Sequence, residues 1–254
     1  MIKSGRFECR PWAVCETALD LDLLGQTESL FALSNGHIGW RANLDEGEPH
    51  SIAGCYLNGV YEEVPLPYAE TAYGYPEAGQ TIVNVTDGKV IRLLVDDEPF
   101  DVRYGTLHAH ERTLDFRTGV LTRTAEWETP THSRVRVRST RMVSLVHRAL
   151  AGVLFEVEPL DDEADLVLQS ELIANEPVVG KGARDPRAGE IVEDALAAEL
   201  DAVTDKGAVL VHSTKRSKLR LAASMDHLVR GRARGRGSSA ASAGRPRHTR
   251  EPCR

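Results

Sequence analysis

Four groups of adjacent acidic residues are the first candidates, because paired carboxylates are the groups that cleave glycosidic bonds, one as acid and the other as base or nucleophile. An acid of this kind needs an apolar pocket that raises its pKa, and adjacent residues of a strand point to opposite sides. We therefore assign most of these acids to turns and to solubility, and none to catalysis. They are Asp45-Glu46, Glu62-Glu63, Asp96-Asp97-Glu98 and Asp161-Asp162-Glu163.

Histidines are the next candidates, because imidazole nitrogens bind zinc. His108 and His110 form an HxH pattern, which predicts that both side chains lie on one face of a strand. No obvious further zinc ligands lie near them, so solvated strand histidines are favoured over a metal site. The sequence contains no P-loop, GxSxG or HExxH motif. We expect no metal and no organic cofactor.

Short strands must position these residues. A hairpin is predicted around Pro130–His132. After this turn Val135 and Val137 alternate with arginines, which places the valines in a core and the arginines on the solvent side. Before it, Glu126 and Glu128 alternate around a tryptophan, so Arg–Glu pairs across the two strands are expected. The arginine row is interpreted as a solvated sheet face rather than an anion site.

The remaining elements also favour β structure. Asp87-Gly88 predicts a second hairpin, because a type I′ turn needs positive φ at both central residues. Many short strands separated by turn signals predict a mainly β fold, a large antiparallel sandwich. Further strands are expected at 152–158, 166–172, 208–213 and 218–223, a loop at 179–189 and an acidic helix at 191–203.

Composition places the chain among soluble globular proteins, with 41% hydrophobic and 27% charged residues. No apolar run approaches the ~18 residues that cross a bilayer, the N-terminus lacks the apolar segment of a signal peptide, and the four cysteines contain no CxxC pair. We expect a cytoplasmic protein with unpaired thiols. The net charge of −7 is uneven, because residues 230–254 hold eight arginines and one acid, which leaves −14 for residues 1–229. Residues 1–229 are predicted to form the β domain, and residues 230–254 a disordered Arg/Gly/Ser-rich tail.

Seven segments occur in an order that resembles the N-terminal domain of glycoside hydrolase family 65. That family contains maltose, trehalose and kojibiose phosphorylases and related hydrolases. The likeness covers about residues 7–229; Ala42 stands where the family commonly has Gly, and Cys55 where it often has Thr. The segments are Pro11-Trp12 with Glu16, ESLFALSNGHIGWRANLDEG (28–47), GCYLNGVYEE (54–63), GYPEAGQTIVNV (74–85), LLVDDEPFDV (93–102), HERTLDFRTGVLTR (110–123) and STRMVSL (139–145).

The resemblance implies a galactose-mutarotase-like super-sandwich joined to an (α/α)6 barrel. In such enzymes a barrel Glu protonates the glycosidic oxygen while phosphate, or an activated water, attacks the anomeric carbon with inversion. Inorganic phosphate is then a cosubstrate, and no organic cofactor is needed. Because only 27 residues follow His227, we expect the barrel to be missing and this chain to be inactive on α-glucosidic disaccharides. Intact relatives are often homodimers, and we leave the oligomeric state of this chain open.

The resemblance also marks residues expected to face the missing barrel or a sugar. Asn35-Gly36 suits a tight turn, since Gly adopts positive φ freely and Asn tolerates it. Trp40 would stack on a sugar or pack beneath the interface, and Arg41 would pair with a barrel carboxylate. Docking is favoured over sugar contact, because Trp is usually largely buried. Tyr61 joins this candidate set.

Two other functions are weighed. A free-standing carbohydrate-binding sandwich would bind glucosides without turnover, yet its unpartnered surface would expose apolar side chains. A nucleic-acid-binding protein would use RGRARGRG in the tail, where arginine supplies charge and stacking. The acidic body opposes that function, because it repels phosphates. The preferred origin of the tail is a reading-frame slip in GC-rich DNA.

Overall fold

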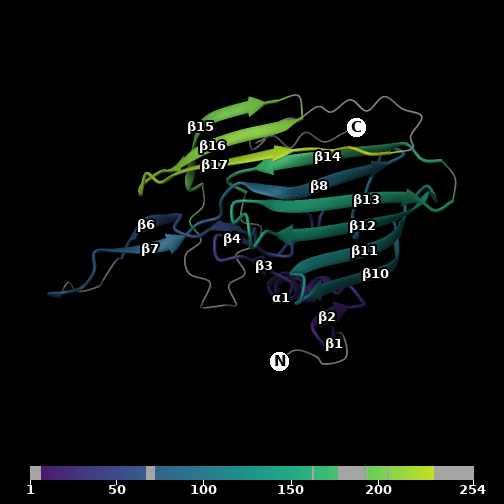
Figure 1. The fold of residues 1–254 in the computed structure, drawn as a ribbon, viewed down its shortest axis with the longest axis horizontal. Helices are drawn as coiled ribbons and strands as arrows, with labels where there is room; N and C mark the ends of the chain where they lie inside the picture. The colour runs from purple at the N-terminus through teal and green to yellow at the C-terminus, as the bar shows by residue number, and fades with distance from the viewer. Residues whose placement is uncertain are drawn as a thin grey trace. The chain divides into compact units, whose positions relative to one another are not determined.

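The computed structural model describes residues 7–66, 72–161, 163–176, 192, 194–204 and 206–231, and these are mainly β (Figure 1). The predicted mainly β, antiparallel fold class is confirmed. The chain divides into two compact units, the first formed by Met1–Asn58 with Lys89–Ser170 and the second by Gly59–Gly88 with Glu171–Arg254. The predicted tail beyond residue 231, the loop 179–189 and Asp162 lie outside the described residues.

The first unit contains most of the strands and both described helices. A six-stranded antiparallel sheet has the order β1-β2-β10-β11-β12-β13, and a three-stranded sheet has the order β3-β4-β5. The elements are β1 (Phe7–Arg10), β2 (Ala13–Glu16), η1 (Leu21–Leu23), α1 (Leu24–Leu30), β3 (Leu33–Ser34), β4 (Ile38–Trp40), β5 (Cys55–Leu57), β9 (Glu98–Pro99), β10 (Thr106–Asp115), β11 (Val120–Glu128), β12 (Arg134–Val143) and β13 (Ala151–Pro159). Two strands, β8 (Asp87–Val95) and β14 (Leu166–Ile173), contribute residues to both units and pair in the order β14-β8-β9.

Alternation in β11 and β12 follows the prediction. Val135 and Val137 are buried, and Arg136 lies on the opposite face, where it pairs with Glu126 at 2.9 Å and with Glu158 at 2.8 Å. The hairpin around residues 130–132 is confirmed, since Glu126 faces Arg136 in the β11–β12 register. Arg136 therefore lies on a solvated face, where neighbouring acids match its charge.

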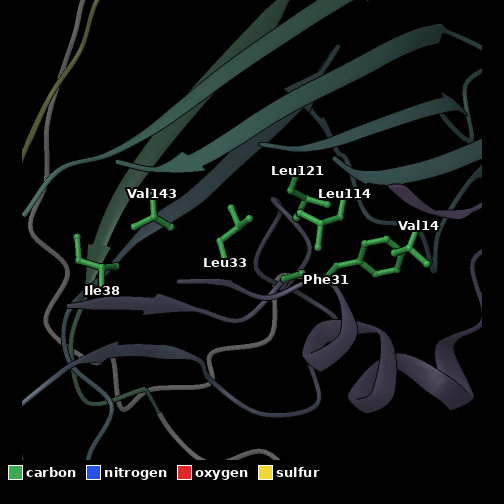
Figure 2. Close-up of a cluster of buried hydrophobic side chains, with 8 residues drawn as sticks. Val14, Phe31, Leu33, Ile38, Leu114, Leu121 and Val143 are labelled. Atoms are coloured by element: carbon green, nitrogen blue, oxygen red, sulfur yellow. The ribbon is translucent and has the colours of Figure 1, made fainter. Parts of the chain in front are cut away.

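The buried face of the six-stranded sheet carries two apolar clusters. At one end the sheet packs on Phe31, which follows α1, and on residues of β3 and β4 (Figure 2). At the other end it packs on residues of β8 and on Phe100, whose ring meets Trp127 edge-on at 5.3 Å between centroids. The first cluster consists of Val14, Phe31, Leu33, Ile38, Ala42, Leu114, Leu121 and Val143. This unit is thus a sandwich with the long sheet as one layer.

The second unit contains two smaller sheets. One has the order β15-β16-β17 and the other pairs β6 with β7. The buried carboxylate of Glu62 accepts hydrogen bonds from the backbone N–H groups of Arg216 at 2.9 Å and Ser217 at 2.7 Å, which fixes the β16–β17 turn. Its strands are β6 (Tyr61–Pro65), β7 (Ala78–Ile82), β15 (Leu196–Val203), β16 (Gly207–Thr214) and β17 (Arg220–Asp226).

Two sequence predictions about local structure are wrong. The expected helix at 191–203 is replaced by strand β15, because pairing with β16 and burial of Leu196 override the helix propensity of an Ala-, Glu- and Leu-rich segment. Asp87-Gly88 is not a hairpin turn; it begins strand β8, and Gly88 lacks the positive φ that such a turn needs. A Cβ on Gly88 would lie 3.0 Å from Leu172, so this glycine permits close packing instead.

Candidate functional site

The turn between β3 and β4 is organised by Asn35. Its Oδ1 accepts hydrogen bonds from the backbone N–H groups of His37 at 2.9 Å and Ile38 at 2.8 Å. Gly36 has φ of +79°, a conformation that glycine adopts without steric cost. The sequence prediction of a tight turn at Asn35-Gly36 is therefore confirmed.

The same amide joins this turn to the one between β12 and β13. Asn35 Nδ2 donates to the carbonyl oxygens of Ser144 at 2.7 Å and Arg148 at 2.9 Å. In return, Arg148 Nη2 donates to the carbonyl oxygen of Gly36 at 3.2 Å. Every polar atom of the Asn35 side chain is thus engaged in holding two turns together.

Trp40 and Arg41 are held inside the first unit. Trp40 is partly buried and packs against the apolar cluster of Figure 2. The Arg41 guanidinium contacts the buried carboxylate of Glu28 in α1 at 3.2 Å and donates to the carbonyl oxygen of Gly25 at 3.0 Å. A Cβ on Gly54 would lie 2.3 Å from the Arg41 side chain, so glycine is required where this arginine crosses β5. Arg41 already has its carboxylate within the domain.

Tyr61 lies in the second unit, where it pairs with Ile82 across β6 and β7. Its backbone carbonyl accepts a hydrogen bond from the Ser217 hydroxyl at 2.5 Å. The four other candidates belong to the first unit, so the five residues do not form one cluster within a unit.

Sequence reasoning missed a buried ionic network beneath the six-stranded sheet. Asp45 and Glu46 are 1% and 3% exposed, which corrects their assignment to solubility and turn chemistry. Arg123 contacts Asp45 at 3.0 Å and Glu46 at 2.5 Å, and Arg141 contacts Asp45 at 2.6 Å. The hydroxyl of Ser139 donates to Asp45 at 2.8 Å. These contacts attach the loop after β4 to β11 and β12.

A second buried pair extends the network. Arg112 of β10 contacts Glu16 of β2 at 2.7 Å, and its guanidinium lies 5.1 Å above the ring of Phe31. Strand parity was the signal that could have revealed these arginines. Arg123 and Arg141 stand at the same alternating positions as Leu121 and Val143, which face the core.

The HxH prediction is also corrected. A register shift between Leu107 and Ala109 marks a β-bulge, which breaks the alternation so that His108 and His110 lie on different faces. His108 is near the surface and contacts Glu128 at 2.7 Å. His110 is buried, and its Nε2 accepts a hydrogen bond from Arg123 Nε at 3.3 Å.

The electrostatics of the network oppose acid–base catalysis. Burial acts to raise the pKa of Asp45, but Arg141, Arg123 and the hydroxyl of Ser139 together hold it below its ordinary value. Burial, with Arg123 and Arg112 nearby, lowers the pKa of His110 to about 2. Asp45 is thus an ionised acceptor and His110 a neutral one at physiological pH, whereas a glycosidic general acid must carry a proton. The arrangement is suited to holding a loop in place.

A hollow of about 200 Å³ lies beside this network in the first unit. Two of its acidic side chains share one arginine as their partner. Arg103 contacts Asp101 at 2.5 Å and Glu48 at 3.2 Å. The described residues hold no group of three or more His, Cys, Asp or Glu side chains that would bind a metal ion. The hollow is lined by Glu46, Glu48, Arg92, Leu93, Leu94, Pro99, Phe100, Asp101, Val167 and Gln169.

Known proteins resemble this chain over most of its length. The model of the N-terminal domain of glycosyl hydrolase family 65 matches residues 14–251. An uncharacterised glycosyl hydrolase of Mycobacterium tuberculosis (strain CDC 1551 / Oshkosh) is 55% identical over 229 residues, which are 90% of this chain and 29% of the relative. An α,α-trehalose phosphorylase of Thermoanaerobacter brockii is 31% identical over 86% of this chain and 29% of its own length.

A solved structure shares the fold. A putative kojibiose phosphorylase from the human microbiome superposes with a TM-score of 0.74 at 22% identity, covering 90% of this chain and 29% of that one. The chain therefore spans less than a third of the length of these relatives. Across the described part of the chain, no helix is long and apolar enough to pass through a membrane.

Proposed function

The chain belongs to the N-terminal domain family of glycosyl hydrolase family 65, and from that premise we propose that it is the non-catalytic β domain of a phosphorylase or hydrolase that acts on α-glucosidic disaccharides. The observation that carries the proposal is the match over 90% of this chain to relatives more than three times longer. Trehalose, maltose and kojibiose phosphorylases are among the named relatives.

The chemistry of the buried network supports a non-catalytic role. Its acids are bound by arginines, and Arg141 and Arg123 hold the pKa of Asp45 below its ordinary value. We propose that the general acid and the groups that bind phosphate lie in the remainder of the enzyme. Inorganic phosphate would then be the cosubstrate of a phosphorylase and water that of a hydrolase.

Carbohydrate metabolism and a cytoplasmic location belong to the same proposal. The location is supported by Cys15, which is buried as a free thiol, as expected in a reducing compartment. Asn35, Gly36, Trp40 and Arg41 would act by shaping the domain, because their described contacts are internal. The free-standing sugar-binding module and the nucleic-acid-binding tail gain no support from the relatives' names.

The test is an activity assay on two proteins. The purified 254-residue chain is incubated with phosphate and trehalose, maltose or kojibiose, and release of sugar phosphate and of free glucose is measured. A chimera carries residues 1–229 of this chain in place of the matched segment of the M. tuberculosis relative. We expect no turnover by the chain and turnover of at least one disaccharide by the chimera. Turnover by the chain alone would refute the non-catalytic assignment.

The origin of the tail is tested separately. Resequencing the gene and translating all three frames beyond the codon for His227 shows whether a family 65 sequence continues in another frame. Such a continuation supports a frameshift. The same 25-residue ending in several independent isolates, with no continuation in any frame, contradicts it.

A further inference from the structure

One end of the six-stranded sheet displays large apolar side chains. Because the strands are antiparallel neighbours, the turns β1–β2, β10–β11 and β12–β13 lie at the same end. Their exposed residues are Trp12 (59%), Phe116 (58%), Leu145 (74%), Val146 (84%) and Leu150 (58%). We call these three turns the turn face. Clustered exposure of this kind marks an interaction surface in a soluble protein.

The first two turns are joined to each other. The backbone N–H of Phe116 donates to the carbonyl oxygen of Trp12 at 2.8 Å. The guanidinium of Arg117 lies 5.5 Å above the Trp12 ring, and Trp12 holds a positive φ of 68°, which is unfavourable for a bulky residue. Residues held in unfavourable backbone conformations cluster at functional positions.

The third turn is held by Asn35. The two hydrogen bonds from Asn35 to Ser144 and Arg148 fix the loop that carries Leu145 and Val146. Ordering these side chains before contact lowers the entropy cost of binding. Asn35 is therefore a positioning residue for this surface.

The opposite end of the same sheet has a different character. The β11–β12 turn is Thr129-Pro130-Thr131-His132-Ser133, and Glu128 beside it accepts hydrogen bonds from His108 and His132 at 2.7 Å. Tyr104, which precedes β10 at this end, is a large exposed side chain at 62%, with Arg103 lying 5.8 Å from its ring. The exposure of side chains at the turn face can thus be compared with that of Tyr104 at the opposite end of the same sheet.

The size of the turn face fits a domain interface. Strands lie ~4.8 Å apart, so four spacings separate the first turn from the third by ~19 Å. The face also carries Arg117 and exposed Arg148. Pairing this face with its own copy would bring these like charges together, which disfavours a symmetric dimer. The partner that fits is apolar with an acidic rim.

We propose that the turn face is the surface on which the C-terminal remainder of the family 65 enzyme docks. This inference rests on the proposed function. The matched family model is that of an N-terminal domain, and the chain spans 29% of its relatives, so more than two thirds of each relative lies outside the matched segment and is the partner that this surface would contact.

Hydroxyl-radical footprinting tests the proposal, since it reads the exposure of each side chain. The full chain and the chimera with the M. tuberculosis relative are compared. Oxidation of Trp12, Phe116 and Leu145 is expected to fall at least fivefold in the chimera, whereas that of Tyr104 stays unchanged. Unchanged oxidation of the three turns, or protection of Tyr104 instead, overturns the proposal.

Variants and concentration separate the other outcomes. Leu145→Asp combined with Val146→Asp in the chimera is expected to restore oxidation of Trp12, and Tyr104→Asp is expected not to. Protection of the turn face in the chain alone that grows with protein concentration would assign the face to a second copy and overturn the proposal. A chimera that turns over sugar without protection of the turn face refutes the proposed surface and supports the proposed function. A chimera in which the turn face is protected but no sugar is turned over supports the proposed surface and contradicts the proposed function.

Discussion

Replacing Arg123 with methionine tests whether the buried network holds the first unit together. The change removes four hydrogen bonds, one to Asp45, two to Glu46 and one to His110. Asp45 keeps Arg141 and Ser139, so Glu46 is the carboxylate left buried without its cation. Breaking a buried ion pair on one side costs about 3–5 kcal/mol. Arg136→Met, on the solvated face of the same sheet, removes an exposed pair and is expected to cost about 0–1 kcal/mol.

Urea unfolding followed by tryptophan fluorescence measures both variants. All three tryptophans, Trp12, Trp40 and Trp127, belong to the first unit, so the signal reports on that unit. With an m-value of about 2 kcal/mol per molar urea, Arg123→Met should lower the midpoint by about 2 M. The double variant Arg123→Met with Glu46→Met removes the stranded charge and should recover at least half of the loss. A loss for Arg123→Met no larger than that for Arg136→Met would refute the reasoning.

Three further predictions follow from individual side chains. Because the pKa of His110 is lowered to about 2, only the unfolded state takes up a proton on this residue as the pH falls below about 6.5. The free energy of unfolding should therefore decrease toward acid by at most about 1.4 kcal/mol per pH unit. His110→Gln should flatten this slope in urea titrations between pH 6.5 and 4.5. Asn35→Ala leaves two carbonyls of the β12–β13 turn without their donor and should cost about 1–3 kcal/mol, with faster amide hydrogen exchange at 144–150 and unchanged exchange at 129–133. Glu62→Ala removes the acceptor of two backbone N–H groups and should destabilise the second unit by about 1–3 kcal/mol, whereas Glu62→Gln, which keeps one oxygen, should cost less in thermal unfolding followed by circular dichroism.

The fold class was predictable because it depends on local patterns. Alternation of valine and arginine in β12, with Glu126 opposite, specified a strand, its buried face and its partner strand. The turn at Asn35-Gly36 was predictable for the same reason, since its conformation follows from two residue types. The family resemblance came from ordered segments of sequence and is borne out over residues 14–251.

Other features depended on neighbours that are distant in the sequence. Ala, Glu and Leu in 191–203 favour a helix, and only the presence of β16 beside them makes a strand. The bulge at His108 has no local signal, yet it separates His108 from His110. The Asp45–Arg123 pair joins residues 78 positions apart.

The sequence by itself thus determined the mainly β fold class, the β11–β12 hairpin, the tight turn and the family, because these follow from nearest neighbours and from ordered motifs. Only the tertiary structure decided that Asp45 and Glu46 are buried, that Arg41 is paired within its own domain, and that three hairpin turns gather Trp12, Phe116 and Leu145 at one end of a sheet. The physical reason is that burial and charge pairing depend on which distant strands become neighbours, and strand order is a property of the folded chain.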